Sequence, residues 1–117
     1  MIYLASPYSG TPEVMEQRYQ QVMQVTATLM RAGVPVFSPI VHCHALAQKW
    51  HMPTDFSFWQ FYNRQMIDAA RQLWVLKLEG WLESTGVRGE VAHAGATGKP
   101  VFYIDPAGPF PVYWGSR

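Results

Sequence analysis

The chain has 117 residues, of which 49% are hydrophobic and 15% charged, and its net charge is +1, which favours one folded domain over residues 1–117 and argues against a nucleic-acid polymer as partner. The lone Cys43 excludes an internal disulfide and fits a reducing compartment, where we expect a packed thiol. No apolar stretch is long enough to span a membrane and no basic leader precedes the first strand, so we expect a cytoplasmic protein with no membrane partner.

Residues 1–5, MIYLA, predict a first strand, and a loop from Ser6 to Gly10 follows it directly. The loop has neither the GKS or GKT of a P-loop nor the GxGxxG of a dinucleotide fingerprint. Its two serines and its free amides, placed before a helix, could hold a phosphate or a sugar hydroxyl. The alternative is a plain tight turn.

A helical pattern begins at Thr11, with Pro12 near the first helical position, and ends at Gly33. Residues 34–38 then predict a second strand, and Pro35 indicates an edge position for it. A strand, a helix and a strand within so short a segment form a βαβ unit, which predicts a parallel sheet.

Residues 39–53 have no clear periodicity, and we expect them to be irregular. They contain His42, His44 and His51. Two histidines in a His-x-His pattern, without a nearby carboxylate or second cysteine, are a weak ligand set, so we predict no metal site. The histidines are expected to be structural or to line a pocket beyond the second strand.

The next helix is capped by Thr54 or Asp55. Its expected apolar side consists of Phe58, Trp59, Tyr62, Met66, Ala69 and Ala70. Asn63 interrupts this side as a polar residue. Arg64 and Asp68 lie one turn apart, as expected of a solvated ion pair.

Residues 73–78 predict a buried strand, and a loop rich in glycine follows. Gly80, Gly86 and Gly89 would let a ligand approach the backbone. Ser84 and Thr85 offer hydroxyls that can cap a helix or contact a ligand.

Glu90 is the candidate catalytic residue, and we expect it in the first turn of a helix running to about Gly98. The helix dipole would keep its carboxylate ionised there, and an exposed acid in this position contributes less than about 1 kcal/mol to stability. The alternative is an ordinary first-turn acid, although Val87 takes the place that a capping box would need. A face of small residues would pack against the sheet and hold Glu90 at its carboxyl edge. That face consists of Val91, Ala94, Gly95 and Gly98.

Residues 101–104 predict a last strand, closed by Asp105-Pro106. The tail over residues 107–114 ends in Val112, Tyr113 and Trp114, which would be costly to leave in water. We expect it to fold back on the domain or onto a second subunit, so we predict a homo-oligomer.

Three segments carry a resemblance to a known family: IYLASPYSG, LKLEGWLESTGVRGE and AGATGKPVFYI, in this order. Together they resemble the nucleoside 2-deoxyribosyltransferase-like superfamily and its short bacterial relatives of unassigned function. The resemblance covers the first strand with its loop and residues 73–104, and leaves the middle of the chain poorly matched.

The resemblance implies an α/β, flavodoxin-like three-layer sandwich with a parallel sheet of four or five strands. It implies that Glu90 attacks the anomeric carbon of a 2-deoxyribosyl group without a cofactor, and that the partner is a small nucleoside or nucleotide. By resemblance, the sugar or 5′-phosphate lies against Ser6, Tyr8, Ser9 and Gly10. The residues of the second loop expected to contact substrate are Gly80, Trp81, Ser84 and Gly86.

The family usually has one aspartate before the strand that precedes the catalytic loop and another on the preceding helix. Arg71 or Gln72 and Asn63 occupy these places here. The acid for the leaving base would then come from Asp68, Glu79, Glu83, His93 or a neighbouring subunit, and Asp68 and His93 are our acid/base candidates. The implied function is cleavage or transfer at the N-glycosidic bond of a (deoxy)nucleoside or nucleotide. The alternative is a non-catalytic nucleotide- or nucleoside-binding module on the same fold.

Overall fold

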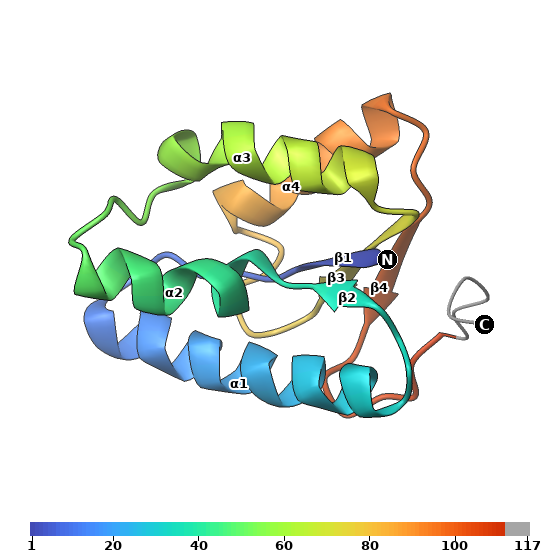
Figure 1. Ribbon diagram of the computed structural model, residues 1–117, viewed down its shortest axis with the longest axis horizontal. Helices are drawn as coiled ribbons and strands as arrows, with labels where there is room; N and C mark the ends of the chain where they lie inside the picture. Colours follow the sequence, from blue (N-terminus) through green and yellow to red (C-terminus); the bar gives the residue numbers. More distant parts are fainter. Residues whose placement is uncertain (112–117) are drawn as a thin grey trace.

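The computed structural model describes residues 1–111, which form an α/β domain of the flavodoxin-like kind (Figure 1). In chain order the elements are β1 (Ile2–Ala5), α1 (Pro12–Arg31), β2 (Val36–Phe37), α2 (Pro39–Lys49), α3 (Phe56–Ala69), β3 (Gln72–Leu76), α4 (Thr85–Ala96) and β4 (Val101–Ile104). No helix in this part of the chain is both long and apolar enough to cross a membrane.

The four strands form one parallel sheet in the order β2-β1-β3-β4, which confirms the predicted parallel sheet and the edge position of the second strand. β1 and β3 are central, and their register pairs Ile2 with Gln72 and Ala5 with Val75. Every residue of β1 is buried, because helices cover both faces of the sheet. The carboxyl ends of the strands, and the loops that follow them, therefore meet at one edge.

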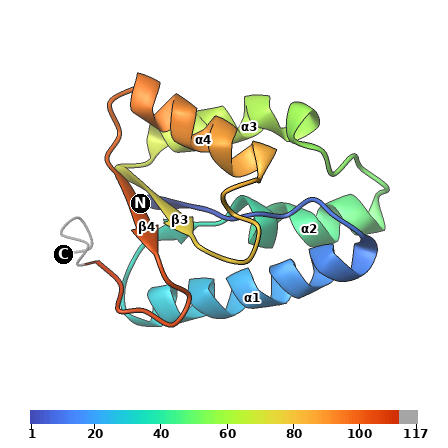
Figure 2. The same ribbon diagram turned by 180° about the vertical axis from the view of Figure 1, so that it is seen from behind.

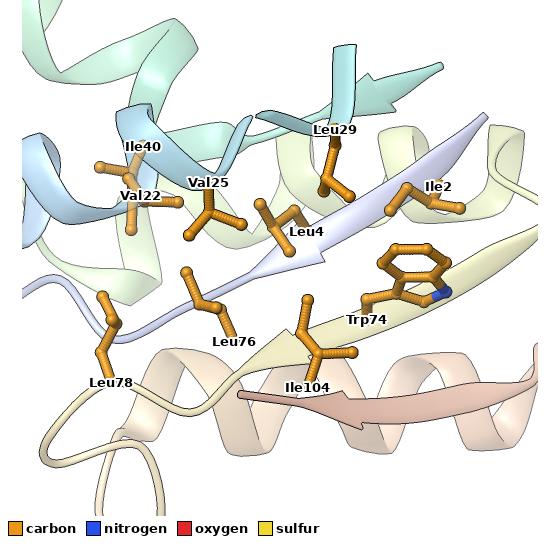
Figure 3. Packing of buried hydrophobic residues seen from close by; sticks show 10 residues of the cluster. All are labelled: Ile2, Leu4, Val22, Val25, Leu29, Ile40, Trp74, Leu76, Leu78 and Ile104. Carbon is orange, nitrogen blue, oxygen red and sulfur yellow. The ribbon is translucent and has the colours of Figure 1, made fainter. Parts of the chain in front are cut away.

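Two apolar cores lie on opposite faces of this sheet. On one face, residues of α1 such as Val25 and Leu29 pack on Leu4 and Trp74 (Figure 3). On the other face, Ile67 of α3 and the inward side of α4 pack on the remaining strand residues. α3 and α4 lie together on this second face, whereas α2 lies beside α1 (Figures 1 and 2). The arrangement agrees with right-handed βαβ connections.

The helix ends follow the sequence signals. Thr11 caps α1 by accepting a hydrogen bond from the Val14 N–H at 3.2 Å, with Pro12 as the first helical residue. Gly33 follows the end of α1 with φ of +82°, a conformation that glycine adopts without strain. Ser84 caps α4 in the same way, by accepting from the Val87 N–H at 3.2 Å.

Two predictions for the middle of the chain are wrong. The segment expected to be irregular contains α2, which begins at Pro39 because Ser38 caps it by accepting from the Val41 N–H at 3.1 Å. In α3, the inward side chains are Asn63 and Ile67, while Phe58 and Tyr62 are exposed. The predicted apolar side of α3 is therefore wrong at Phe58 and Tyr62, whereas Met66 and Ala70 do pack with the core, because the first half of the helix borders a cavity.

The last part of the chain continues from β4 along the α1 side of the sheet. Phe110 packs against the core on that side, which agrees with a tail that folds back on the domain. Val112, Tyr113 and Trp114, on which the predicted aromatic tail mainly depends, lie outside the described residues.

Candidate functional site

A cavity of about 670 Å³ opens at the carboxyl edge of the sheet, where the loops after β1 and β3 meet α2 and the start of α3. Its volume lies within the range of about 300–1,000 Å³ that is usual for small-molecule sites. The residues that line it are Ser6, Tyr8, Ser9, Arg18, Pro39, Ile40, Cys43, His44, Ala47, Thr54, Asp55, Phe56, Ser57, Trp59, Asn63, Gly80, Glu83, Ser84, Thr85, Gly86 and Glu90. Open α/β sheets bind ligands at this edge.

Glu90 lines the cavity from α4, but its place in the helix differs from the prediction. Because Ser84 is the cap and Thr85 the first helical residue, Glu90 lies in the second turn. The inward line of α4 consists of Val87, Glu90 and Ala94, whereas Gly95 is exposed and Gly98 lies beyond the helix. The predicted small face is therefore wrong at both of these glycines.

The Glu90 carboxyl group is almost fully buried, with 6% of the residue exposed. It accepts a hydrogen bond from the hydroxyl of Tyr3, which lies on β1 and is itself inaccessible to solvent. Burial raises the pKa of Glu90 to about 7, and the hydrogen bond from Tyr3 opposes part of that rise. The expectation of a carboxylate kept fully ionised by the helix dipole is therefore wrong. At this depth, the cost of desolvating the charge exceeds the stabilisation that the dipole gives it.

Burial also raises the pKa of Tyr3 well above its ordinary value, and the neighbouring Glu90 adds to the effect. The Tyr3 hydroxyl thus stays protonated over the whole physiological range and remains a donor. It holds one Glu90 oxygen, which leaves the rest of the carboxyl group to face the cavity. A pair of this kind can orient a carboxylate as a nucleophile or as a proton acceptor.

Arg18 joins the two loops at the mouth of the cavity. Its guanidinium donates to the Ser9 carbonyl oxygen and to the Glu79 carbonyl oxygen, each at 3.0 Å. Gly80 has φ of +89°, and a Cβ atom there would lie 2.6 Å from Arg18 Nη2. The backbone conformation therefore favours glycine at this position, and a larger residue would also displace the end of the Arg18 side chain.

A line of three polar side chains leads from the cavity to the outer surface of α1. The Tyr8 hydroxyl lies 2.6 Å from His44 Nδ1, and His44 Nε2 lies 3.2 Å from a Glu16 carboxylate oxygen. Tyr8 and His44 line the cavity, while Glu16 on α1 faces outward. The prediction that histidines after the second strand line a pocket is confirmed for His44. His42 instead stacks on Tyr62 at the surface.

Two buried polar atoms at the cavity have no hydrogen-bond partner among residues 1–111. They are the Ser6 hydroxyl oxygen and the Asn63 amide oxygen Oδ1. Leaving such a group unpaired costs about 1–3 kcal/mol. Both atoms belong to residues that line the cavity, although the atoms themselves have almost no exposed surface, and Asn63 Oδ1 can only accept.

Most of the predicted substrate-contacting residues line the cavity: Ser6, Tyr8, Ser9, Gly80, Ser84 and Gly86. Gly10 and Trp81 do not. A Cβ atom on Gly10 would meet the side chain of Val14, and Trp81 packs against Tyr103 with ring centroids 5.4 Å apart.

The two acid/base candidates from the sequence lie apart from the cavity lining. Asp68 and His93 contact each other across α3 and α4, with Oδ1 and Nε2 2.7 Å apart. This pairing replaces the expected Arg64–Asp68 ion pair, because α4 brings a histidine alongside Asp68. Glu83 does line the cavity, at its exposed rim.

Sequence reasoning missed Tyr3 as the partner of Glu90 and Arg18 as a cavity residue, and it placed Asn63 only where the family usually has an aspartate. Tyr3 is a polar-tipped side chain in an otherwise apolar strand, and that exception was the available signal. Asn63 was treated as an interruption of an apolar side, although an amide in such a position also indicates a functional face. Arg18 gives no signal, since its role depends on two loops that are distant in sequence.

The described residues 1–111 contain no group of three or more His, Cys, Asp or Glu side chains placed to hold a metal ion. Cys43 lines the cavity as a buried thiol, and burial raises its pKa to about 11. It is therefore a neutral wall residue at physiological pH.

The fold and the cavity define a small flavodoxin-like α/β protein with a buried carboxyl group in a ligand site at the carboxyl edge of the sheet. The model of the family described as "Domain of unknown function (DUF1937)" matches residues 1–105, and the chain belongs to this family. No curated protein sequence matches the chain.

Proposed function

We propose that the protein cleaves or transfers at the N-glycosidic bond of a (deoxy)nucleoside or nucleotide, with Glu90 as nucleophile. The observation that carries the proposal is the buried Glu90 carboxyl group, held by the Tyr3 hydroxyl on the wall of a cavity of about 670 Å³. The resemblance of LKLEGWLESTGVRGE to the nucleoside 2-deoxyribosyltransferase-like superfamily supports the same residue in the same role.

The burial of Glu90 suits this chemistry. Cleavage of an N-glycosidic bond passes through a transition state with positive charge on the sugar ring. A desolvated carboxylate is stabilised when that charge develops beside it, and forming an ester to the anomeric carbon removes its own charge. As the new C–O bond forms, the electron pair of the C–N bond leaves with the base. Water or a second base then attacks the same carbon and releases Glu90.

The remaining lining supports a sugar and a base as ligand. Ser6 and Ser9 border Glu90's cavity from the loop after β1, and Ser84 and Thr85 border it from the other loop. Hydroxyls of this kind pair with sugar hydroxyls. Asn63 Oδ1, which is buried and unpaired among the described residues, would accept from an N–H or O–H group of the ligand.

The alternative is a non-catalytic module that binds the same class of ligand. Asn63 favours this alternative. It lines the cavity in the place of a family aspartate, and an amide can form hydrogen bonds but cannot transfer a proton. In addition, the pKa of Glu90 near 7 means that a large part of the protein holds a neutral carboxylic acid at neutral pH. A protonated Glu90 binds but does not attack.

Incubation with a panel of 2′-deoxynucleosides and their 5′-monophosphates, with free base read by chromatography, separates the two functions. We expect release of base to fall as the pH is lowered through about 7, because Glu90 then becomes protonated. Glu90→Gln keeps the shape of the side chain and should reduce turnover by about a thousandfold or more. Glu83→Gln removes a carboxylate at the exposed rim of the same cavity and, as the matched control, should reduce turnover far less than Glu90→Gln.

Ligand binding without release of base, across the whole panel, would favour the binding module. Undiminished turnover in Glu90→Gln would exclude Glu90 as nucleophile. An equal loss in Glu90→Gln and Glu83→Gln would indicate a disturbed cavity rather than a lost nucleophile.

The expected homo-oligomer also stays a prediction, and several exposed side chains support it. Trp50 is 66% exposed and Phe61 is 76% exposed. Exposed aromatic side chains mark a contact surface where they gather in one contiguous patch. Light scattering after size-exclusion chromatography should give a mass above that of one chain, and a mass of 13.3 kDa would contradict the prediction.

A further inference from the structure

His44 is held on every side of its ring. Both of its nitrogens have partners, Tyr8 on Nδ1 and Glu16 on Nε2, and its side chain is only 2% exposed. The Tyr19 ring stacks on the imidazole, with centroids 4.2 Å apart and planes 22° apart. The three groups Tyr8, His44 and Glu16 therefore form one fixed line of hydrogen bonds.

This line connects the cavity with the outside of α1. Tyr8 and His44 line the cavity, and the Glu16 side chain at the other end is 49% exposed. Both ring nitrogens of this buried histidine are paired, and one of the two partners lies at the surface. Since each member can pass a proton to the next, the line is a route for a proton between the cavity and a charged group in contact with water.

The Glu16 carboxylate at the outer end of this line determines which nitrogen of His44 carries a proton. Hydrogen bonds from Gln20 and then from His44 lower the pKa of Glu16, so its carboxylate is ionised at neutral pH and can only accept. His44 Nε2 therefore carries a proton toward Glu16. His44 Nδ1 then faces the Tyr8 hydroxyl, as acceptor when the ring is neutral and as donor when it is an imidazolium ion.

We propose that Tyr8 is the catalytic acid that protonates the departing base, and that His44 and Glu16 are positioning residues that resupply its proton. The inference rests on the proposed function. It fills the place of the family aspartates that this chain lacks. Of the candidate acids named from the sequence, only Glu83 lines the cavity, and it lies at the exposed rim.

In the first step the proton comes from the imidazolium form of His44, in which Nε2–H donates to the Glu16 carboxylate and Nδ1–H donates to the Tyr8 oxygen. The Tyr8 hydroxyl proton passes to the leaving nitrogen as the C–N electron pair moves onto that nitrogen, and Tyr8 takes the Nδ1 proton. Glu90 forms the ester to the anomeric carbon. The products are the neutral base, neutral His44 and the glycosyl ester.

The second step returns the proton by the same route. Water, or a second base bearing an N–H group, attacks the anomeric carbon and gives its proton to the Tyr8 oxygen. The Tyr8 proton moves back to His44 Nδ1, and the C–O bond to Glu90 breaks with its electrons on the carboxylate. The site is then in its starting state.

The placement of the two groups suits a nucleophile and an acid acting on one bond. Glu90 comes from α4, on the face of the sheet that α3 and α4 cover, and Tyr8 packs with the core on the α1 face. They therefore enter the cavity from opposite layers. Burial is the main reason that the pKa of Tyr8 is raised, so its hydroxyl keeps its proton until the leaving group takes it.

The test compares two leaving groups in the same protein. One substrate is the nucleoside or nucleotide of the panel that the wild-type protein cleaves, whose base needs a proton to leave. The other is 4-nitrophenyl 2-deoxyriboside, whose 4-nitrophenolate leaves without one. Tyr8→Phe should reduce turnover of the first about 100-fold and of the second less than about threefold. His44→Asn keeps a hydrogen-bonding group near the position of Nδ1 but cannot transfer a proton. It should also reduce turnover of the first substrate more than that of the second, by a smaller factor than Tyr8→Phe does.

Tyr19→Leu is the structural control, because it removes the ring stacked on His44 and leaves the proton route intact. Tyr19→Leu should change turnover of the two substrates by the same factor. Equal losses on both substrates in Tyr8→Phe, or no loss on the nucleoside, would overturn the acid role while leaving the proposed function in place. Absence of turnover by the wild-type protein on every substrate would overturn the proposed function and the acid role together.

Discussion

Replacing Glu90 by glutamine should stabilise the protein at alkaline pH, because the native fold holds this carboxyl group out of water. Its pKa is about 7 in the folded protein, against an ordinary value of 4.5. The difference between these values, 7 − 4.5 = 2.5, corresponds to a total of about 3 kcal/mol at about 1.4 kcal/mol for each pH unit. An exposed first-turn acid, as the sequence predicted, would contribute less than about 1 kcal/mol.

The direction of the change in stability with pH follows from which state, folded or unfolded, binds the Glu90 proton more tightly. Between about pH 4.5 and pH 7 the folded protein keeps the Glu90 proton while the unfolded chain has released it, so stability decreases as the pH rises through this interval. Above pH 7 both states are ionised and the loss is complete. Glu90→Gln has no such proton, so its stability lacks this decrease.

Urea denaturation of both proteins at about pH 5.5 and about pH 8.5 measures the effect. The free energy of unfolding of Glu90→Gln, relative to wild type, should be greater at the higher pH by about 2 kcal/mol. Effects of the substitution that do not depend on pH cancel in this comparison, and Glu83→Gln should show no such difference. An equal offset at both pH values would refute the inference that the buried carboxyl group is protonated in the native state near neutral pH.

Three further substitutions test the surroundings of the site. Tyr3→Phe removes the hydrogen bond that lowers the pKa of Glu90, so the upper end of the pH interval over which stability is lost should move to higher pH in the same urea measurements. Gly80→Ala places a Cβ atom 2.6 Å from Arg18 Nη2 at a residue with φ of +89°, and should cost about 1–3 kcal/mol in thermal or urea unfolding. Ser84→Ala removes the cap of α4 and should cost about 1 kcal/mol, and an unchanged unfolding midpoint would contradict the capping role.

Several elements could be predicted because their signals are local. The apolar runs of β1 and β4, the Thr11 cap of α1 and the glycine after its end are patterns within a few residues of each other. They depend on backbone geometry and on the exclusion of water from apolar side chains. The parallel order of the strands followed from the alternation of strands and helices alone.

The same local reasoning failed where a polar group faces inward. In α3 the apolar side chains were assigned to the core, yet Phe58 is exposed and Asn63 is buried beside the cavity. The helical repeat identifies two faces of a helix, but it does not say which face meets the sheet and which meets a cavity. The Ser38-Pro39 signal for α2 was present and was missed.

The sequence by itself determined that the chain forms an α/β domain with a parallel sheet, because chain order and local pattern suffice for that, and it indicated Glu90 as the candidate catalytic residue through its position and a family resemblance. Only the tertiary structure decided the state of that residue. The raised pKa of Glu90, its bond to Tyr3 and the line from Tyr8 through His44 each join residues far apart in the chain. Desolvation and hydrogen bonding depend on which side chains surround a group in space, and that arrangement exists only when the layers have packed.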